Sequence, residues 1–90
     1  METRKLHCIG MVQGVGFRWS IQLLAQKMHI TGTVKNNSDG TVTIIAQGSK
    51  ELLDKFTEKI PEAAHYAVVS RIDTEILPET RKMHSFSVVY

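Results

Sequence analysis

The hydrophobic positions of this chain follow two different periods in successive stretches. Four stretches alternate apolar and polar side chains every second residue, which is the period of a β-strand: 5–12, 31–37, 41–47 and 68–75. Two stretches repeat apolar side chains every three or four residues, which is the period of an amphipathic helix: 17–28 and 49–60. With a short final strand expected over residues 85–90, the predicted order is β-α-β-β-α-β plus one strand.

The apolar positions of the two helices predict which faces are buried. In the first helix the buried face is expected to hold Phe17, Ile21, Leu24 and Met28. In the second helix it is expected to hold Leu52, Leu53, Phe56 and Ile60. Ser49 is a natural N-cap for the second helix, and Pro61 is expected to end it. Trp19, in the first turn of the first helix, is expected to pack, with a place in the wall of a cleft as the alternative.

The strands carry further local signals. Both faces of residues 5–12 hold apolar side chains, so this strand is expected to be central in the sheet. Ser38-Asp39-Gly40 predicts the turn of a hairpin. In the strand over 68–75, the wetter face is expected to hold Val69, Arg71, Asp73 and Glu75. Residues 77–83 are predicted to form a polar loop.

The order of elements predicts an α+β fold. Two split β-α-β units form a ferredoxin-like sandwich, in which an antiparallel sheet carries two helices on one face. A chain of 90 residues is long enough for one core, so residues 1–90 are expected to form a single domain. Many unrelated functions use this fold, so the function has to be argued from a site.

Composition narrows the compartment and the kinds of partner that are expected for the protein. The net charge is only +2, from eleven Lys and Arg against nine Asp and Glu, and this balance does not indicate a nucleic-acid binder. The single cysteine, Cys8, favours a reducing compartment over a disulfide framework. No apolar run reaches the roughly 18 residues of a membrane span, and no signal peptide is expected at the first residues. The chain is expected to be cytoplasmic and monomeric, with no membrane or nucleic-acid partner.

Residues 12–18, Val-Gln-Gly-Val-Gly-Phe-Arg, join the first strand to the first helix. Gly14 and Gly16 let the backbone turn tightly and approach a ligand closely. A loop that enters a helix N-terminus offers unpaired N–H groups and the positive end of the helix dipole, which favour phosphate. Arg18 adds a charged fork for phosphate oxygens. The stretch predicts a phosphate-binding loop, and a plain strand-to-helix turn with a solvated arginine is the alternative.

The other candidate groups give weaker signals. Asn36 and Asn37 precede the hairpin turn, so they either simply suit that turn or provide an amide that orients a water. The four histidines have no metal-ligand spacing: His7, His29, His65 and His84. No two carboxylates are paired near the glycine loop. A site built only from an arginine and backbone N–H groups suits a leaving group that departs unaided. A carboxylate does so, since its conjugate acid has a pKa of about 4. The sequence therefore favours mixed carboxylic-phosphoric anhydrides over phosphomonoesters.

Two segments resemble the signature sequences of the acylphosphatase family. The first is Gly10-Met11-Val12-Gln13-Gly14-Val15-Gly16-Phe17-Arg18, and the second is Gly32-Thr33-Val34-Lys35-Asn36 followed by Asp39-Gly40-Thr41-Val42. Their order, their spacing and the chain length match the family over nearly the whole sequence. The resemblance implies a ferredoxin-like fold and hydrolysis of acyl phosphates to a carboxylate and inorganic phosphate. Trp19 stands where a tyrosine is frequent, and the region after the second helix lacks a frequent Gly-Pro pair.

The resemblance also implies roles for single residues. Arg18 would bind the phosphate and Asn36 would orient the attacking water, with no metal ion or cofactor. Backbone N–H groups of the loop would hold the phosphoryl oxygens, from Gln13, Gly14, Val15, Gly16 and Phe17 to Arg18. Two alternatives remain: a non-catalytic anion-binding or RNA-binding module, and the phosphatase-like part of a larger carbamoyl-transfer machine.

Overall fold

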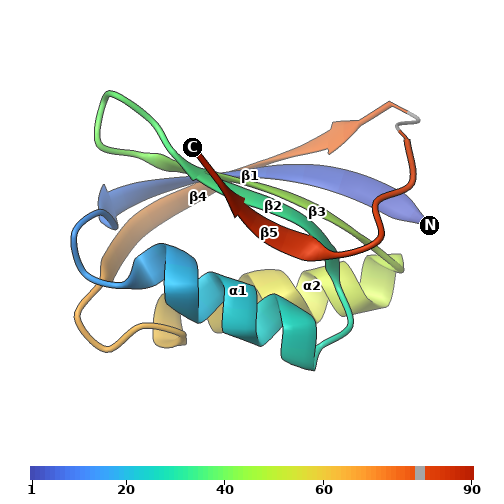
Figure 1. Cartoon of the computed structure of the whole chain (residues 1–90), viewed down its shortest axis with the longest axis horizontal. Coiled ribbons are helices and arrows are strands. Elements are labelled where there is room, and N and C mark those ends of the chain that lie inside the picture. The colour runs from blue at the N-terminus through green and yellow to red at the C-terminus, as the bar shows by residue number, and fades with distance from the viewer. Residues whose placement is uncertain (79–80) are drawn as a thin grey trace.

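The computed structural model describes residues 1–78 and 81–90. Its elements follow one another in the predicted order: β1 (Glu2–Met11), α1 (Phe17–Lys27), β2 (Thr31–Asn36), β3 (Val42–Gly48), α2 (Lys50–Lys59), the 3-10 turn η1 (Ile60–Glu62), β4 (Val68–Leu77) and β5 (Phe86–Val89). Both helices lie against the same face of one sheet (Figure 1). The predicted ferredoxin-like α+β sandwich is confirmed.

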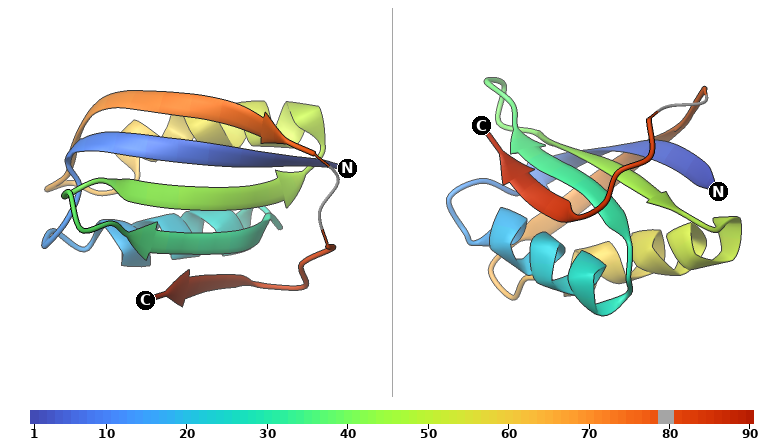
Figure 2. Two further views of the ribbon diagram at one scale, coloured as in Figure 1. Left: turned by 90° about the horizontal axis from the view of Figure 1, so that it is seen from above. Right: turned by 45° about the vertical axis from the view of Figure 1, so that its right-hand side comes forward.

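The strands form a mixed five-stranded sheet in the order β4-β1-β3-β2-β5. β1 pairs antiparallel with both β3 and β4. β2 pairs antiparallel with β3, as the predicted hairpin requires. β5 instead runs parallel to β2 and forms one edge of the sheet (Figure 2). The predicted central place of β1 is also confirmed, since it lies between two neighbours.

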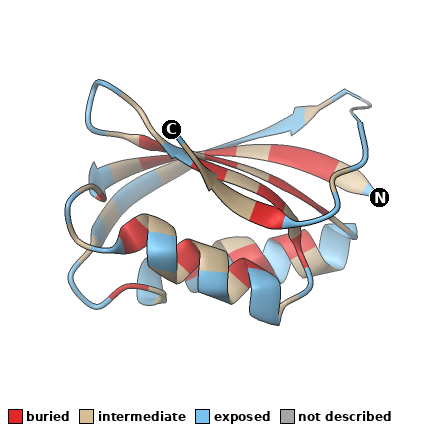
Figure 3. Ribbon diagram, viewed as in Figure 1, coloured by how far each residue is buried: buried red, intermediate tan, exposed pale blue. Residues whose placement is uncertain are grey.

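The core lies between the sheet and the two helices. Figure 3 shows the buried residues on the inner side of the sheet and on the helix faces turned towards it. β1 contributes Leu6 and Cys8, and β3 contributes Val42, Ile44 and Ala46, all with less than 2% of their surface exposed. Neither α1 nor α2 covers the opposite face of the sheet (Figure 1). This face is therefore half-exposed at most of its central positions.

The helix predictions hold except at the margin of the core. In α1, Phe17 and Ile21 are buried as expected, but Ala25 takes the third buried place while Leu24 and Met28 pack at the margin of the core. In α2, the Ser49 hydroxyl accepts a hydrogen bond from the Leu52 N–H at 3.2 Å, so the predicted cap is confirmed. α2 ends at Lys59, just before Pro61, as expected. Pro61 itself sits in η1, where its missing N–H is tolerated in the first turn.

The face assigned to Val69 was wrong. The pairing of β1 with β4 shifts register between Ile9 and Gly10, so that Gly10 lies opposite Val69 and one residue of β4 is bulged out. A bulge moves the following side chains to the other face of the sheet. Val69 and Ile72 both pack against the core as a result.

Gln47 holds the part of the β4–β5 connection that precedes β5. The Gln47 side chain donates to the Arg81 carbonyl at 2.8 Å and accepts from the Met83 N–H at 2.7 Å. Part of the predicted polar loop over 77–83 falls on residues 79–80, which lie outside the described residues. Within the described ranges, neither helix has the length and apolar character of a membrane span.

Candidate active site

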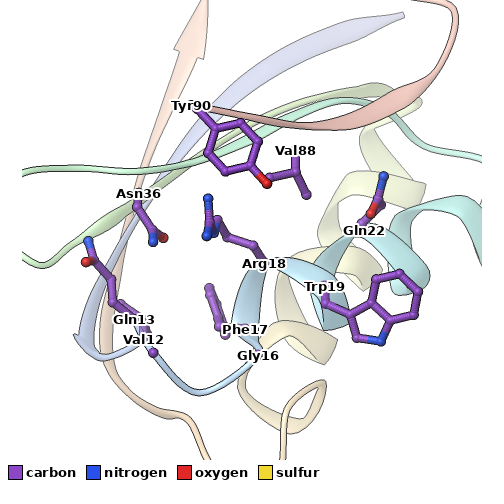
Figure 4. A pocket seen from close by; sticks show the side chains of 11 residues that line it. Val12, Gln13, Gly16, Phe17, Arg18, Trp19, Gln22, Asn36, Val88 and Tyr90 are labelled. Atoms are coloured by element: carbon purple, nitrogen blue, oxygen red, sulfur yellow. The ribbon is translucent and has the colours of Figure 1, made fainter.

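A cavity of about 370 Å³ opens where the β1–α1 loop meets the end of β2 and the end of β5 (Figure 4). Its lining comes from four parts of the chain: Val12, Gln13, Gly14, Gly16, Phe17, Arg18, Trp19, Gln22, Asn36, Val88 and Tyr90. The two sequence motifs, far apart along the chain, thus face one hollow. Both Arg18 and Asn36, the residues to which the resemblance assigns the chemistry, line it.

The loop takes the glycine conformation that the sequence predicted. Gly14 has φ of 73° and Gly16 has φ of 76°, both in the left-handed region that favours glycine. Gly16 is the N-cap of α1, and its carbonyl accepts from the Ser20 N–H at 3.1 Å. The first N–H groups of a helix lack partners within the helix, and the first turn of α1 holds no acidic side chain. This end of α1 is therefore electropositive and suits an anion.

Arg18 projects into the cavity and is half-buried. Its guanidinium carbon lies 5.0 Å from the centroid of the Tyr90 ring, which is a cation–π distance. The ion pairs of the described residues involve Arg4, Lys50 and Arg71, and Arg18 makes none of them. The positive charge of Arg18 is therefore not neutralised by a described carboxylate.

Asn36 lies on the helix side of β2, on the same face as the buried Val34. Its Oδ1 atom is buried and has no hydrogen-bond partner among the described residues. Nearly all buried polar atoms have a partner, so an exception needs an explanation. Figure 4 shows the Asn36 amide and the Arg18 guanidinium projecting into the same space. A ligand or a water in the cavity would meet both groups.

Asn37 provides the hydrogen bonds of the hairpin. Its Nδ2 donates to the hydroxyls of Thr41 at 3.0 Å and Thr43 at 2.8 Å. Its backbone N–H donates to the Thr41 carbonyl at 2.8 Å. The turn-forming interpretation of the asparagine pair therefore fits Asn37, and it leaves the Asn36 side chain unused by the hairpin.

The remaining loop residues differ in what their side chains do. Gln13 bonds to the hairpin, with Nε2 at 2.7 Å from the Asn37 carbonyl and 2.9 Å from the Thr41 carbonyl. Phe17 is buried beneath the cavity, and Val15 packs against the core. The sequence expectation for these residues concerned their backbone N–H groups, and it stays a prediction.

Sequence reasoning missed part of the lining. Trp19 was expected to pack, with the wall of a cleft as the alternative, and the alternative holds: 63% of its surface is exposed and it lines the rim of the cavity. Gln22, Val88 and Tyr90 were not singled out. Gln22 is one turn beyond Arg18 on α1, so helical spacing could have indicated it. Val88 and Tyr90 reach the cavity because β5 pairs with β2, and no local signal gives that pairing.

The described Asp, Glu, His, Lys and Cys side chains lie outside the cavity lining. Burial raises the pKa of the Cys8 thiol to about 12, so this cysteine is not a ready nucleophile. Among the described residues, no three His, Cys, Asp or Glu side chains gather in a way that would hold a metal ion. The charged partner for an anion in the cavity is thus Arg18, together with the electropositive start of α1.

Comparison with known proteins adds an independent line of argument. The model of the family described as Acylphosphatase matches residues 4–88. The chain is 50% identical over 91 residues to an acylphosphatase of Lactobacillus johnsonii, and the match covers 100% of both chains.

Solved structures give the same result for the fold. The crystal structure of acylphosphatase from Bacillus subtilis superposes with a TM-score of 0.95 at 36% identity, covering 100% of each chain. The structure of full-length HypF in the phosphate- and nucleotide-bound form contains a similar part, with a TM-score of 0.89 at 31% identity. That match covers 99% of this chain and 12% of the HypF chain.

Proposed function

The chain belongs to the acylphosphatase family and is an acylphosphatase enzyme, and on this basis we propose how its residues carry out the reaction. The proposed reaction is metal-independent hydrolysis of the carboxyl–phosphate bond of an acyl phosphate. Its products are a carboxylate and inorganic phosphate. The family membership supports a small-molecule acyl phosphate as the substrate.

The phosphoryl group binds to the loop of residues 13–18. Backbone N–H groups of Gln13 to Phe17 and the start of α1 donate to its oxygens, and the Arg18 guanidinium neutralises charge from the other side. Two observations support this arrangement: the left-handed backbone at Gly14 and Gly16, and the absence of a described carboxylate partner for Arg18. Phosphoryl transfer depends mainly on positioning and on charge stabilisation, which these groups provide.

Asn36 holds the attacking water. The observation that carries this step is the buried Oδ1 without a described partner, on a residue that lines the same cavity as Arg18. A water donates one hydrogen bond to Oδ1 and directs its lone pair at phosphorus, in line with the bond to the carboxyl oxygen. The new phosphorus–oxygen bond forms as that bond breaks. The carboxylate leaves with the electron pair, and the protons of the water remain with inorganic phosphate or pass to solvent.

We also propose that residues 1–90 act as one domain, as a monomer in the cytoplasm. One core between one sheet and two helices supports a single unit. A lone, buried Cys8 suits a reducing compartment. Light scattering on the purified chain tests the monomer, which should have a mass near 10.1 kDa.

Isotope incorporation tests the proposed reaction. Benzoyl phosphate is hydrolysed by the enzyme in water enriched in oxygen-18, and both products are analysed by mass spectrometry after subtraction of the uncatalysed reaction. Attack at phosphorus predicts one heavy oxygen in inorganic phosphate and none in benzoate. Heavy oxygen in benzoate would show attack at the carbonyl carbon and contradict the proposal.

Matched arginine variants test the role of the charge. Arg18→Ala should lower kcat/KM by about 10²–10³-fold, as expected for loss of one strong stabilising contact in a transition state. Arg71→Ala is the control, because Arg71 is an exposed arginine of β4 paired with Asp73. Equal effects of the two variants would contradict a specific role for Arg18.

A further inference from the structure

The two halves of the active site are carried by strands that do not touch. The phosphate-binding loop leaves β1, and Asn36 ends β2, but β3 lies between these strands in the sheet. Direct backbone pairing therefore does not fix the distance between the loop and Asn36. In-line attack needs this distance to be held closely, since reacting atoms must meet at about 3–3.5 Å.

The Gln13 side chain bridges this gap. Its Nε2 lies 2.7 Å from the Asn37 carbonyl oxygen and 2.9 Å from the Thr41 carbonyl oxygen. Both partners are carbonyls, which only accept, so the NH₂ group of the amide must face them. Each carbonyl also accepts a backbone hydrogen bond within the hairpin, at 3.2 Å from the Gly40 N–H and at 2.8 Å from the Asn37 N–H. Gln13 thus donates to the two carbonyls that flank the turn of the hairpin, those of Asn37 and Thr41.

We propose that Gln13 is a positioning residue, whose side chain sets the phosphate-binding loop at a fixed distance from the water held by Asn36. The Gln13 backbone belongs to the loop, and its amide ends on the residue that follows Asn36. The side chain touches neither the water nor the phosphate in this role. The inference rests on the proposed function of Asn36 and of the loop.

This role predicts a specific kinetic signature. Loss of the Gln13 amide leaves the loop glycines and Arg18 in place, so inorganic phosphate should still bind. Alignment of the Asn36 water with phosphorus is lost, and a misplacement of about 1 Å can cost a hundredfold in rate. Loss of a residue that only stabilises the fold would lower the melting temperature. In the folded enzyme, both kcat and phosphate binding would then stay unchanged.

The first experiment measures kcat with benzoyl phosphate and the inhibition constant of inorganic phosphate for Gln13→Met. The substitution keeps the length of the side chain and removes its donors. We expect kcat to fall about 10- to 100-fold and the inhibition constant to change less than threefold. Gln26→Met is the matched control, since Gln26 is an exposed glutamine on α1 outside the cavity lining, and it should behave as wild type. Wild-type kcat in Gln13→Met would overturn the proposal.

A shorter amide guards against a variant that fails to fold. Gln13→Asn keeps the donors but lacks one methylene, so its NH₂ group reaches the two carbonyls less well. It should give the same split between kcat and phosphate inhibition. Wild-type kcat in a folded Gln13→Asn with a lowered melting temperature would show a structural role only and overturn the proposal.

A double-mutant comparison separates this inference from the function on which it rests. In the Asn36→Ala background, Gln13→Met should lower kcat by less than threefold further, because the water that it positions is already lost. Full multiplication of the two single effects would overturn the positioning role and leave the role of Asn36 intact. Wild-type kcat in Asn36→Ala alone would overturn both the proposed function and this inference.

Discussion

The guanidinium carbon of Arg18 lies 5.0 Å from the centroid of the Tyr90 ring. The two residues come from opposite ends of the chain, and they meet because β5 adds to the edge of the sheet beside β2. The ring contacts the Arg18 guanidinium and leaves its positive charge in place. A carboxylate in the same position would neutralise that charge. Tyr90 itself is 93% exposed, so the contact lies at the mouth of the cavity.

Replacing Tyr90 by leucine should weaken phosphate binding modestly. A cation–π contact at an exposed site contributes about 0.5–1 kcal/mol, which corresponds to about a two- to fivefold change in an equilibrium constant. The inhibition constant of inorganic phosphate should rise by that factor in Tyr90→Leu and stay near wild type in Tyr90→Phe, which keeps the ring. An equal rise in both variants would assign the effect to the hydroxyl and not to the ring face.

Gly16→Ala should destabilise the protein through the backbone alone. A methyl group at Gly16 would meet no atom within 4 Å, but φ of 76° is unfavourable for alanine by about 1–2 kcal/mol. Urea unfolding should show a loss of this size. Gly48→Ala is the matched control, because its backbone is outside the left-handed region and its new methyl group would make ordinary contacts at 3.7 Å. A similar loss in both variants would contradict the conformational explanation.

Acid should weaken the link between β1 and α2. Hydrogen bonds from Arg4, at 2.7 Å, and from Lys50 hold the pKa of Asp54 below its usual range. Since the pKa in the folded state lies below the unfolded value of about 4, the ionised carboxylate stabilises the fold above about pH 4. This contribution is lost as the pH falls below 4 and through the pKa of the folded state.

Asp54→Asn should therefore lower the melting temperature at pH 7 and flatten its decline below about pH 4. Asp73→Asn is the comparison, because Asp73 pairs with Arg71 on the exposed strand β4, where a single ion pair contributes little. If the melting temperature of Asp54→Asn fell in acid as steeply as that of the wild type, the role given to the Arg4–Asp54 pair would be contradicted.

Local chemistry made most of the fold predictable from the sequence. The period of apolar residues gave both helices and the strands, and Ser49 and the turn at Asp39 marked boundaries correctly. Long-range pairing was less accessible. The register shift at Gly10 reversed the face of Val69, and the parallel pairing of β5 has no signature within residues 85–90.

The candidate site was predictable to a similar extent. The loop and Arg18 follow from a strand, two glycines and a helix start, and the cavity contains them. Asn36 and Asn37 could not be told apart by pattern, because their difference lies in which face of the sheet each side chain takes. Packing was favoured over the cleft wall for Trp19, since a large apolar residue in an amphipathic helix usually packs and only the tertiary arrangement shows it to be exposed.

The central claim is that Asn36 works on a water while Asn37 works on the fold. Asn36→Ala removes a buried Oδ1 that has no described partner, so its free energy of unfolding should not fall by more than about 0.5 kcal/mol. Asn37→Ala removes two hydrogen bonds of the hairpin, and its stability should fall by about 1–3 kcal/mol.

The most direct test is kcat for benzoyl phosphate in Asn36→Ala, measured beside the inhibition constant of inorganic phosphate. We predict a fall in kcat of about 10²–10³-fold with phosphate inhibition within threefold of wild type. A folded Asn36→Ala enzyme that binds phosphate and keeps nearly full kcat would contradict the account.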